Sequence, residues 1–160
     1  MSDSKNVIVT GGAGYIGSHT CKELANRGFQ PVVLDDLSTG HEVAVKWGEF
    51  EQANVLDQER VEAIMKKYNP VAVINFAAKS LVGESMEKPT MYHENNVGGA
   101  ISLLNGMKAA GVKHILSSST AAVYGEPEGS DALIESLQLA PINPYAVSYT
   151  HLTLPTTPYV

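Results

Sequence analysis

Thr10-Gly-Gly-Ala-Gly-Tyr-Ile-Gly17 follows the apolar run Val7-Ile8-Val9 and precedes a helical pattern that continues to Arg27. A strand, a glycine-rich turn and a helix in this order are typical of a site for the pyrophosphate of a dinucleotide. Glycines permit the tight turn and let phosphates approach the backbone, while the positive end of the helix favours negative charge. The stretch therefore predicts a dinucleotide site; the alternative is a plain structural turn.

Short apolar runs alternate with helical patterns over the first 120 residues. The pattern predicts strands near 6–10, 31–35, 49–53, 71–75 and 113–117, and helices near 15–28, 57–68 and 90–110. Because residues 32–34 and 71–74 are continuously apolar, we expect strands that are buried on both faces. Repeated β-α-β units predict an α/β fold, a doubly wound parallel sheet of the Rossmann type.

The composition limits the kinds of partner. The chain has 160 residues, 44% of them hydrophobic, and a net charge of −6. We expect one domain with a real core, no nucleic-acid partner because basic patches are lacking, and no membrane span. The one cysteine, Cys21, is expected to be a buried thiol, and the histidines show no metal-ligand spacing. With no signal-peptide pattern, we expect a soluble cytoplasmic protein.

Asp35 ends the second predicted strand, about 20 residues after the glycine turn, where a carboxylate accepts hydrogen bonds from the hydroxyls of an adenosine ribose. Such a carboxylate repels a 2′-phosphate, and no arginine stands beside it. The sequence therefore favours NAD over NADP as the cofactor. The alternative is that Asp35-Asp36 is only a solvated turn.

Further candidates follow the other predicted strands. Asn54-Val55 would bring an amide and an apolar side chain near the adenine, and the small residues in 76–80 would let the cofactor cross the edge of the sheet. Lys79 is either a phosphate ligand or a solvated lysine. Thr120 follows the serine-rich end of the fifth strand and Tyr145 opens the next helix, which makes them candidate groups for proton transfer; serines at a strand end also simply satisfy backbone groups.

Six motifs in order make residues 5–148 resemble the extended short-chain dehydrogenase/reductase family, most closely its UDP-glucose 4-epimerases. They are Thr10-Gly-Gly-Ala-Gly-Tyr-Ile-Gly17, Asp35-Asp-Leu-Ser-Thr-Gly40, Phe76-Ala-Ala-Lys-Ser-Leu-Val-Gly-Glu-Ser85, Asn95-Asn-Val-Gly98, Ser118-Ser-Ser-Thr-Ala-Ala-Val-Tyr-Gly-Glu-Pro127 and Asn143-Pro-Tyr145. In such enzymes NAD takes a hydride from C4 of a UDP-hexose while a tyrosine takes the proton of the 4-hydroxyl.

The resemblance implies roles for individual residues. Tyr145 would be the base, and Thr120 would hydrogen-bond the reacting hydroxyl or relay its proton. The implied NAD site comprises Gly11, Gly14, Tyr15, Ile16, Gly17, Asp35, Asp36, Leu37, Ser38, Thr39, Gly40, Asn54, Val55, Phe76, Ala77, Ala78, Lys79, Ser80 and Asn95. No metal is implied, and the full-length form is expected to be a homodimer with a UDP-hexose as substrate.

The chain departs from this family pattern at two positions. Asn54 stands where an aspartate is common, and an amide carbonyl replaces only part of its acceptor role. The motif Tyr-x-x-x-Lys reads Tyr145-Ala-Val-Ser-Tyr149 here. Free tyrosine has a pKa of about 10, and a nearby ammonium favours the phenolate. Because Tyr149 supplies no positive charge, we expect Tyr145 to lose its base strength.

The end of the chain differs in character from the rest. No charged residue follows Glu135, and Val147-Ser-Tyr-Thr-His-Leu-Thr-Leu-Pro155 matches what a transposon adapter used in sequencing libraries encodes in one reading frame. We therefore expect residues 1–148 to be an incomplete NAD-binding Rossmann domain, truncated before its last strand and the substrate domain, and 149–160 to be a non-native tail. The alternative is a natural family member with a divergent end.

Two other functions compete with epimerization. A non-catalytic NAD-binding sensor of the same fold is supported only by the missing lysine. A nucleotide-sugar 4,6-dehydratase needs a further acid/base pair after the catalytic threonine, where this chain has Ala121-Ala122. Alanines exchange no proton, so dehydration is the weakest of the three hypotheses. The 160-residue chain itself is expected to be an inactive fragment.

Overall fold

The computed structural model describes residues 5–126, 129 and 132–152. The chain divides into two compact units. The first comprises the described parts of Met1–Ala78 and Gly99–Ser118, and the second those of Lys79–Gly98 and Ser119–Val160.

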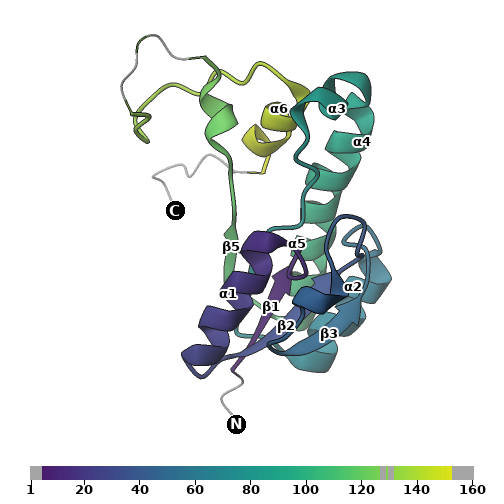
Figure 1. Cartoon of the computed structure of the whole chain (residues 1–160). Helices are drawn as coiled ribbons and strands as arrows, with labels where there is room; N and C mark the ends of the chain where they lie inside the picture. Colours follow the sequence, from purple (N-terminus) through teal and green to yellow (C-terminus); the bar gives the residue numbers. More distant parts are fainter. Residues whose placement is uncertain (1–4, 127–128, 130–131, 153–160) are drawn as a thin grey trace, which may run out of the picture. The chain divides into compact units, whose positions relative to one another are not determined.

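A five-stranded parallel sheet forms the centre of the first unit, in the order β3-β2-β1-β4-β5. Its strands are β1 Asn6–Thr10, β2 Gln30–Asp35, β3 Glu49–Gln52, β4 Ala72–Asn75 and β5 Ile115–Ser117. The helices are α1 Tyr15–Asn26, α2 Gln58–Tyr68 and α5 Gly99–Ala110, with a 3-10 turn, η1, over Glu42–Ala44 (Figure 1). All five strands therefore lie within two residues of the predicted boundaries.

Both faces of this sheet are covered by helices, because alternate strand residues point to opposite sides. Val7, Val9 and Val33 form one buried cluster with Cys21 of α1. The opposite cluster joins Ile8, Val32, Leu34 and Val73 of the strands to residues of α2 and α5, namely Val61, Ile64, Met65, Leu103 and Met107. The predicted doubly wound Rossmann-type sheet is confirmed, and so is the burial of Cys21, which is 1% exposed.

Glu51 links the edge strand β3 to helix α2. Its carboxylate accepts hydrogen bonds from Lys67 Nζ at 2.6 Å, Tyr68 Oη at 2.8 Å and Arg60. Burial by itself raises the pKa of this carboxyl, but the bonds from Lys67 and Tyr68 and the nearby charges outweigh it and leave the pKa of Glu51 lowered. A buried carboxylate is thus compensated by three donors from one helix.

The second unit is built from short helices: α3 Val82–Glu87, α4 Pro89–His93, a π-helical turn η2 over Glu94–Gly98, a 3-10 turn η3 over Ala121–Tyr124, and α6 Pro144–Thr150. The predicted continuous helix over 90–110 is wrong in one respect, because η2 separates α4 from α5. Helix α3 was not predicted. Pro89 at the start of α4 separates it from α3, as expected for a residue that cannot continue a preceding helix.

Candidate functional site

The glycine loop between β1 and α1 is held by backbone contacts that exclude side chains. Gly11 has φ +67°, and a Cβ there would lie 2.9 Å from Ala77 N. A Cβ on Gly17 would overlap the Gly11 carbonyl oxygen and lie 2.7 Å from Gly12 Cα. Gly14 is the N-cap of α1 and makes no side-chain hydrogen bond, and no acidic residue lies in the first turn of this helix. The N–H groups of Gly11, Ala13 and Gly14 bond within the protein, so the N–H groups left for an anion are those of the first turn of α1.

Asp35 connects this loop to the segment after β2. The residue is 8% exposed; its Oδ2 accepts from Ala13 N at 3.0 Å and its Oδ1 from Leu37 N at 2.9 Å. A Cβ on Gly40 would lie 2.9 Å from Asp35 Oδ1. One carboxylate therefore sets the positions of both the glycine loop and the 35–40 turn, which is a role that sequence reasoning did not assign to it.

Asp36 and Asn54 are joined across the ends of β2 and β3. Asn54 Nδ2 donates to Asp36 Oδ2 at 2.9 Å, and Asn54 Oδ1 accepts from Leu56 N at 2.8 Å. Val55, predicted beside Asn54 in the cofactor site, has its side chain in the core of the first unit. A Cβ on Gly99 would come within 2.7 Å of it. The accessible polar group of this dipeptide is the Asn54 amide.

The residues after β4 complete the predicted set in the first unit. Phe76 N donates to Thr10 O at 3.0 Å and Ala77 N to Thr10 Oγ1 at 3.4 Å, so the segment follows the end of β1 closely. Because parallel strands end at the same edge of a sheet, the glycine loop, the 35–40 turn, Asn54 and Phe76–Ala78 gather at that edge. The structure therefore brings together the predicted cofactor residues of this unit.

The second unit holds the other predicted residues: Thr120, Tyr145, Lys79, Ser80 and Asn95. Thr120 begins η3, and its Oγ1 accepts from Ala122 N at 3.2 Å. Asn143 caps α6 by accepting from Ala146 N at 2.8 Å, which places Tyr145 in the first turn of the helix. Helix α6 packs against η3, α3 and α4. Thr120 and Tyr145 thus belong to neighbouring elements of one unit.

Tyr149 lies one turn after Tyr145 on α6 and is 8% exposed. Burial, together with the neighbouring Tyr145, raises the pKa of Tyr149. A buried phenol with a raised pKa stays neutral around pH 7, so this position carries no fixed charge beside Tyr145.

Asn96 is the polar residue of this unit that sequence reasoning missed. It is 2% exposed; its Oδ1 accepts from Lys79 N at 2.8 Å, and its Nδ2 donates to Lys79 O at 3.1 Å and to Ser148 Oγ at 3.0 Å. Asn95 Nδ2 also donates to Asn96 Oδ1 at 3.1 Å. In the sequence, only the motif Asn95-Asn-Val-Gly98 pointed to this position. It led to Asn95 as the predicted site residue and not to its buried neighbour Asn96.

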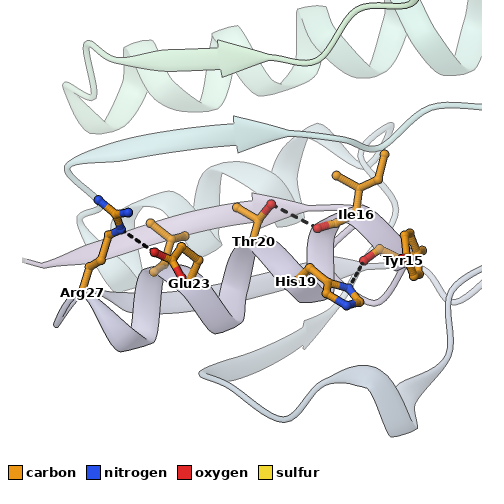
Figure 2. Close-up of a pocket in the computed structure, with 7 residues that line it drawn as sticks. Tyr15, Ile16, His19, Thr20, Glu23 and Arg27 are labelled. Carbon is orange, nitrogen blue, oxygen red and sulfur yellow. Dashed lines mark hydrogen bonds and ion pairs between the residues drawn. The ribbon is translucent and has the colours of Figure 1, made fainter.

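A hollow of about 570 Å³ runs along the outer side of α1 (Figure 2). Of the predicted site residues it is lined only by Tyr15 and Ile16, and its far end is marked by the Arg27–Glu23 ion pair of 2.7 Å. It is therefore a groove on the surface of one helix, separate from Asp35 and Asn54.

Neither a metal-ligand cluster nor a membrane-spanning helix occurs in the part of the chain that the structure describes. No three His, Cys, Asp or Glu side chains in residues 5–126, 129 and 132–152 are grouped to hold a metal ion. Within those same residues, no helix has the length and apolar character needed to cross a membrane.

Comparison with known proteins gives consistent matches. Residues 7–157 match the NAD dependent epimerase/dehydratase family. A UDP-glucose 4-epimerase of Rhizobium meliloti is 48% identical over 142 residues, which are 89% of this chain and 43% of that protein. The chain therefore spans less than half the length of this curated relative.

Solved structures resemble the chain to a similar extent. The UDP-glucose 4-epimerase of Brucella ovis, crystallized with NAD, has a TM-score of 0.88 and 49% identity over 92% of this chain and 45% of its own. The UDP-glucose 4-epimerase of Bifidobacterium longum, solved with NAD+ and UDP, has a TM-score of 0.86 and 34% identity, over 92% and 46% of the two chains.

Proposed function

Because this chain belongs to the NAD dependent epimerase/dehydratase family, we propose that it is the NAD-binding part of an enzyme that interconverts UDP-glucose and UDP-galactose. The observation that carries the proposal is the Asp35 carboxylate, which joins the glycine loop to the 35–40 turn through Ala13 N and Leu37 N. Similarity to UDP-glucose 4-epimerases supports the choice of reaction.

The residues of the first unit suit a dinucleotide, because glycine at positions 11 and 17 lets the loop pack closely on backbone that a Cβ would meet, and α1 then begins without a side-chain cap. In this proposal Tyr15 and Ile16 cover the pyrophosphate at the start of α1. Asp35–Gly40 hold the adenosine ribose, and Asn54 and Val55 border the adenine, Val55 by its backbone because its side chain lies in the core. The remaining proposed ligands are Phe76, Ala77, Ala78, Lys79, Ser80 and Asn95. Bound NAD would supply the acceptor and donor of the hydride at C4 of the hexose.

Tyr145 and Thr120 handle the proton of the 4-hydroxyl in this scheme. Tyr145 takes the proton, and Thr120 hydrogen-bonds the reacting oxygen or relays the proton. Removing a phenol proton near pH 7 requires a nearby positive charge, because free tyrosine has a pKa of about 10. Tyr149 is neutral and buried. We therefore propose that the 160-residue chain binds NAD without appreciable turnover.

We further propose that residues 149–160 are a non-native tail and that the natural protein has lysine at position 149. Sequencing the gene beyond the codon for Ser148 tests this. A lysine codon supports the proposal and removes the ground for the second candidate, a non-catalytic NAD-binding sensor. A tyrosine codon favours that sensor, since Tyr149 is then the natural residue.

The substrate is proposed to be a UDP-hexose, and the full-length protein a homodimer, as the resemblance implies. A cytoplasmic location suits the one cysteine, Cys21, which is a buried free thiol.

Light scattering of the complete gene product would test the proposed dimer. Twice the monomer mass is the expected result, and the mass of a monomer would contradict it.

The decisive assay measures conversion of UDP-galactose to UDP-glucose by the complete gene product. Tyr145→Phe and Thr120→Ala are expected to lower kcat by at least about 100-fold. Thr20→Ala, at a half-buried position on α1 where the hydroxyl bonds to Ile16 O, is the matched control and should keep full activity. No conversion by a folded protein with bound NAD would contradict the proposed reaction.

A further inference from the structure

Asn54 is fixed in one orientation by two different partners. Its Oδ1 accepts from the backbone N–H of Leu56 at 2.8 Å, and its Nδ2 donates to the Asp36 carboxylate at 2.9 Å. Reversing the amide would set its NH2 against a backbone donor and its oxygen against a carboxylate. Asn54 therefore holds Asp36 at a defined position, although 18 residues separate the two.

Asp36 keeps acceptor capacity beyond these bonds. Its Oδ1 accepts from Ser38 N at 2.9 Å and its Oδ2 from Asn54, whereas a carboxylate offers about four acceptor positions. Its neighbour Asp35 is 8% exposed and uses one bond on each oxygen to shape the loop. Asp36 is only partly buried. It is thus the more accessible of the two carboxylates that follow β2.

We propose that Asp36 and Asn54 act as one carboxylate–amide unit that presents a single negative charge to the adenosine half of NAD. In this chain Asp36 carries the charge and is the binding residue, and Asn54 is the residue that positions it. The inference rests on the proposed NAD binding. Adenosine offers hydroxyl and amino donors, for which an ionized carboxylate is a strong acceptor.

An aspartate at position 54 would break this unit. Its carboxylate would lie against that of Asp36, and like charges at this distance disfavour each other's ionization.

Exchanging the two residues would preserve every bond. A carboxylate at position 54 could accept from Leu56 N and from an amide at position 36, and the oxygen of that amide could accept from Ser38 N. The unit therefore needs one carboxylate and one amide, in either order.

The test titrates the 160-residue chain and three variants, Asp36→Asn, Asn54→Asp and the exchange D36N/N54D, with ADP-ribose by calorimetry. Asp36→Asn should weaken binding about tenfold, the loss typical of a hydrogen bond to a charged group. Asn54→Asp should weaken it by about the same factor, because its carboxylate repels that of Asp36. The exchange should restore the affinity to within about twofold of that of the unaltered chain. It should also restore the midpoint of thermal unfolding, which Asn54→Asp alone is expected to lower. The inference is overturned if the exchange loses as much ADP-ribose affinity as the two single variants combined. It is also overturned if Asp36→Asn loses no affinity.

Two controls match the charge changes outside the proposed unit. Asp57→Asn removes one charge at the cap of α2, where asparagine caps as well as aspartate, and Asn105→Asp adds one at an exposed position of α5. Both should leave ADP-ribose affinity unchanged, and a similar tenfold loss in either would overturn the inference. Failure of the unaltered chain to bind ADP-ribose would contradict the proposed function, whereas normal binding by Asp36→Asn contradicts this inference alone.

Discussion

Tyr145 and Tyr149 meet edge to face on helix α6, with ring centroids 5.2 Å apart and ring planes at 85°. The second ring occupies the position where the family resemblance implies a lysine. The contact is a packed aromatic pair that buries one phenol without supplying a charge. This pair stabilises α6 but leaves the candidate base unassisted.

Replacement of Tyr149 by phenylalanine should alter stability at alkaline pH. The pKa of Tyr149 is raised above its ordinary value of 10.0 in the folded state, so the unfolded chain loses this proton first. Stability from this group is complete below about pH 10 and falls as the pH rises further. Urea unfolding at about pH 9 and about pH 11 should show a smaller alkaline loss in Tyr149→Phe than in the unaltered chain.

Tyr15→Phe is the control, because Tyr15 is 82% exposed in the folded chain. An equal alkaline loss in Tyr149→Phe and the unaltered chain would contradict the buried position of Tyr149.

Gly17→Ala should damage the fold and the cofactor site together. The new methyl group would overlap the Gly11 carbonyl oxygen, which is backbone and has little freedom to move. We expect unfolding free energy to fall by about 2 kcal/mol or more. Gly83→Ala on α3 is the control, because no atom lies within 4 Å of its Cβ position, and it should be neutral or stabilising by up to about 1 kcal/mol. Equal effects of the two variants in denaturant unfolding would refute the steric account of the loop.

Glu51→Gln should destabilise the first unit by about 1–3 kcal/mol, because three donors of α2 lose a charged acceptor. The Glu51 pKa is lowered from 4.5, so its contribution is present above about pH 4.5 and lost as the pH falls through the folded-state pKa. In urea unfolding, the midpoints of Glu51→Gln and of the unaltered chain should differ at about pH 7. At about pH 3 the two midpoints should be nearly equal.

Glu62→Gln provides the comparison, because its bond to Lys66 is an i,i+4 surface pair. Its effect should stay below about 0.5 kcal/mol. A Glu51→Gln effect equally small would mean that the buried carboxylate contributes nothing to stability.

The Cys21 thiol should react slowly with a disulfide reagent at about pH 8. Desolvation raises its pKa to about 11 from 9.0, and the residue is 1% exposed. This rise in pKa by itself reduces the thiolate about 100-fold. Labelling of the folded chain, monitored by absorbance, should therefore be at least about 100-fold slower than labelling in concentrated urea. Complete labelling of the folded chain within seconds would disprove the burial of Cys21.

The inner strands β1 and β2 could be predicted from the sequence because strands buried on both faces are apolar throughout, as Val32-Val33-Leu34 illustrates. The break in the helix over 90–110 could not. The π-helical turn η2 contains Asn96, whose side chain bonds to Lys79 and Ser148, residues 17 and 52 positions away. Helical periodicity describes neighbours along the chain, and it carries no information about such distant partners.

The sequence predicted which residues belong to the candidate site, but not the contacts that hold them together. Glycine spacing and the place of Asp35 after a strand identified the residues, because those features are local. The bond from Ala13 N to Asp35 and that from Asn54 to Asp36 join separate loops, and only the folded sheet brings them together. Tyr149 was recognized as a departure, but its burial depends on how α6 packs.

Calorimetric titration of the 160-residue chain with NAD and NADP tests most directly whether the glycine loop and Asp35 form a site for NAD. We predict saturable binding of one NAD per chain and at least about tenfold weaker binding of NADP, because a 2′-phosphate is repelled by Asp35. Absence of saturable NAD binding by the folded chain, or equal affinity for the two dinucleotides, would contradict such a site.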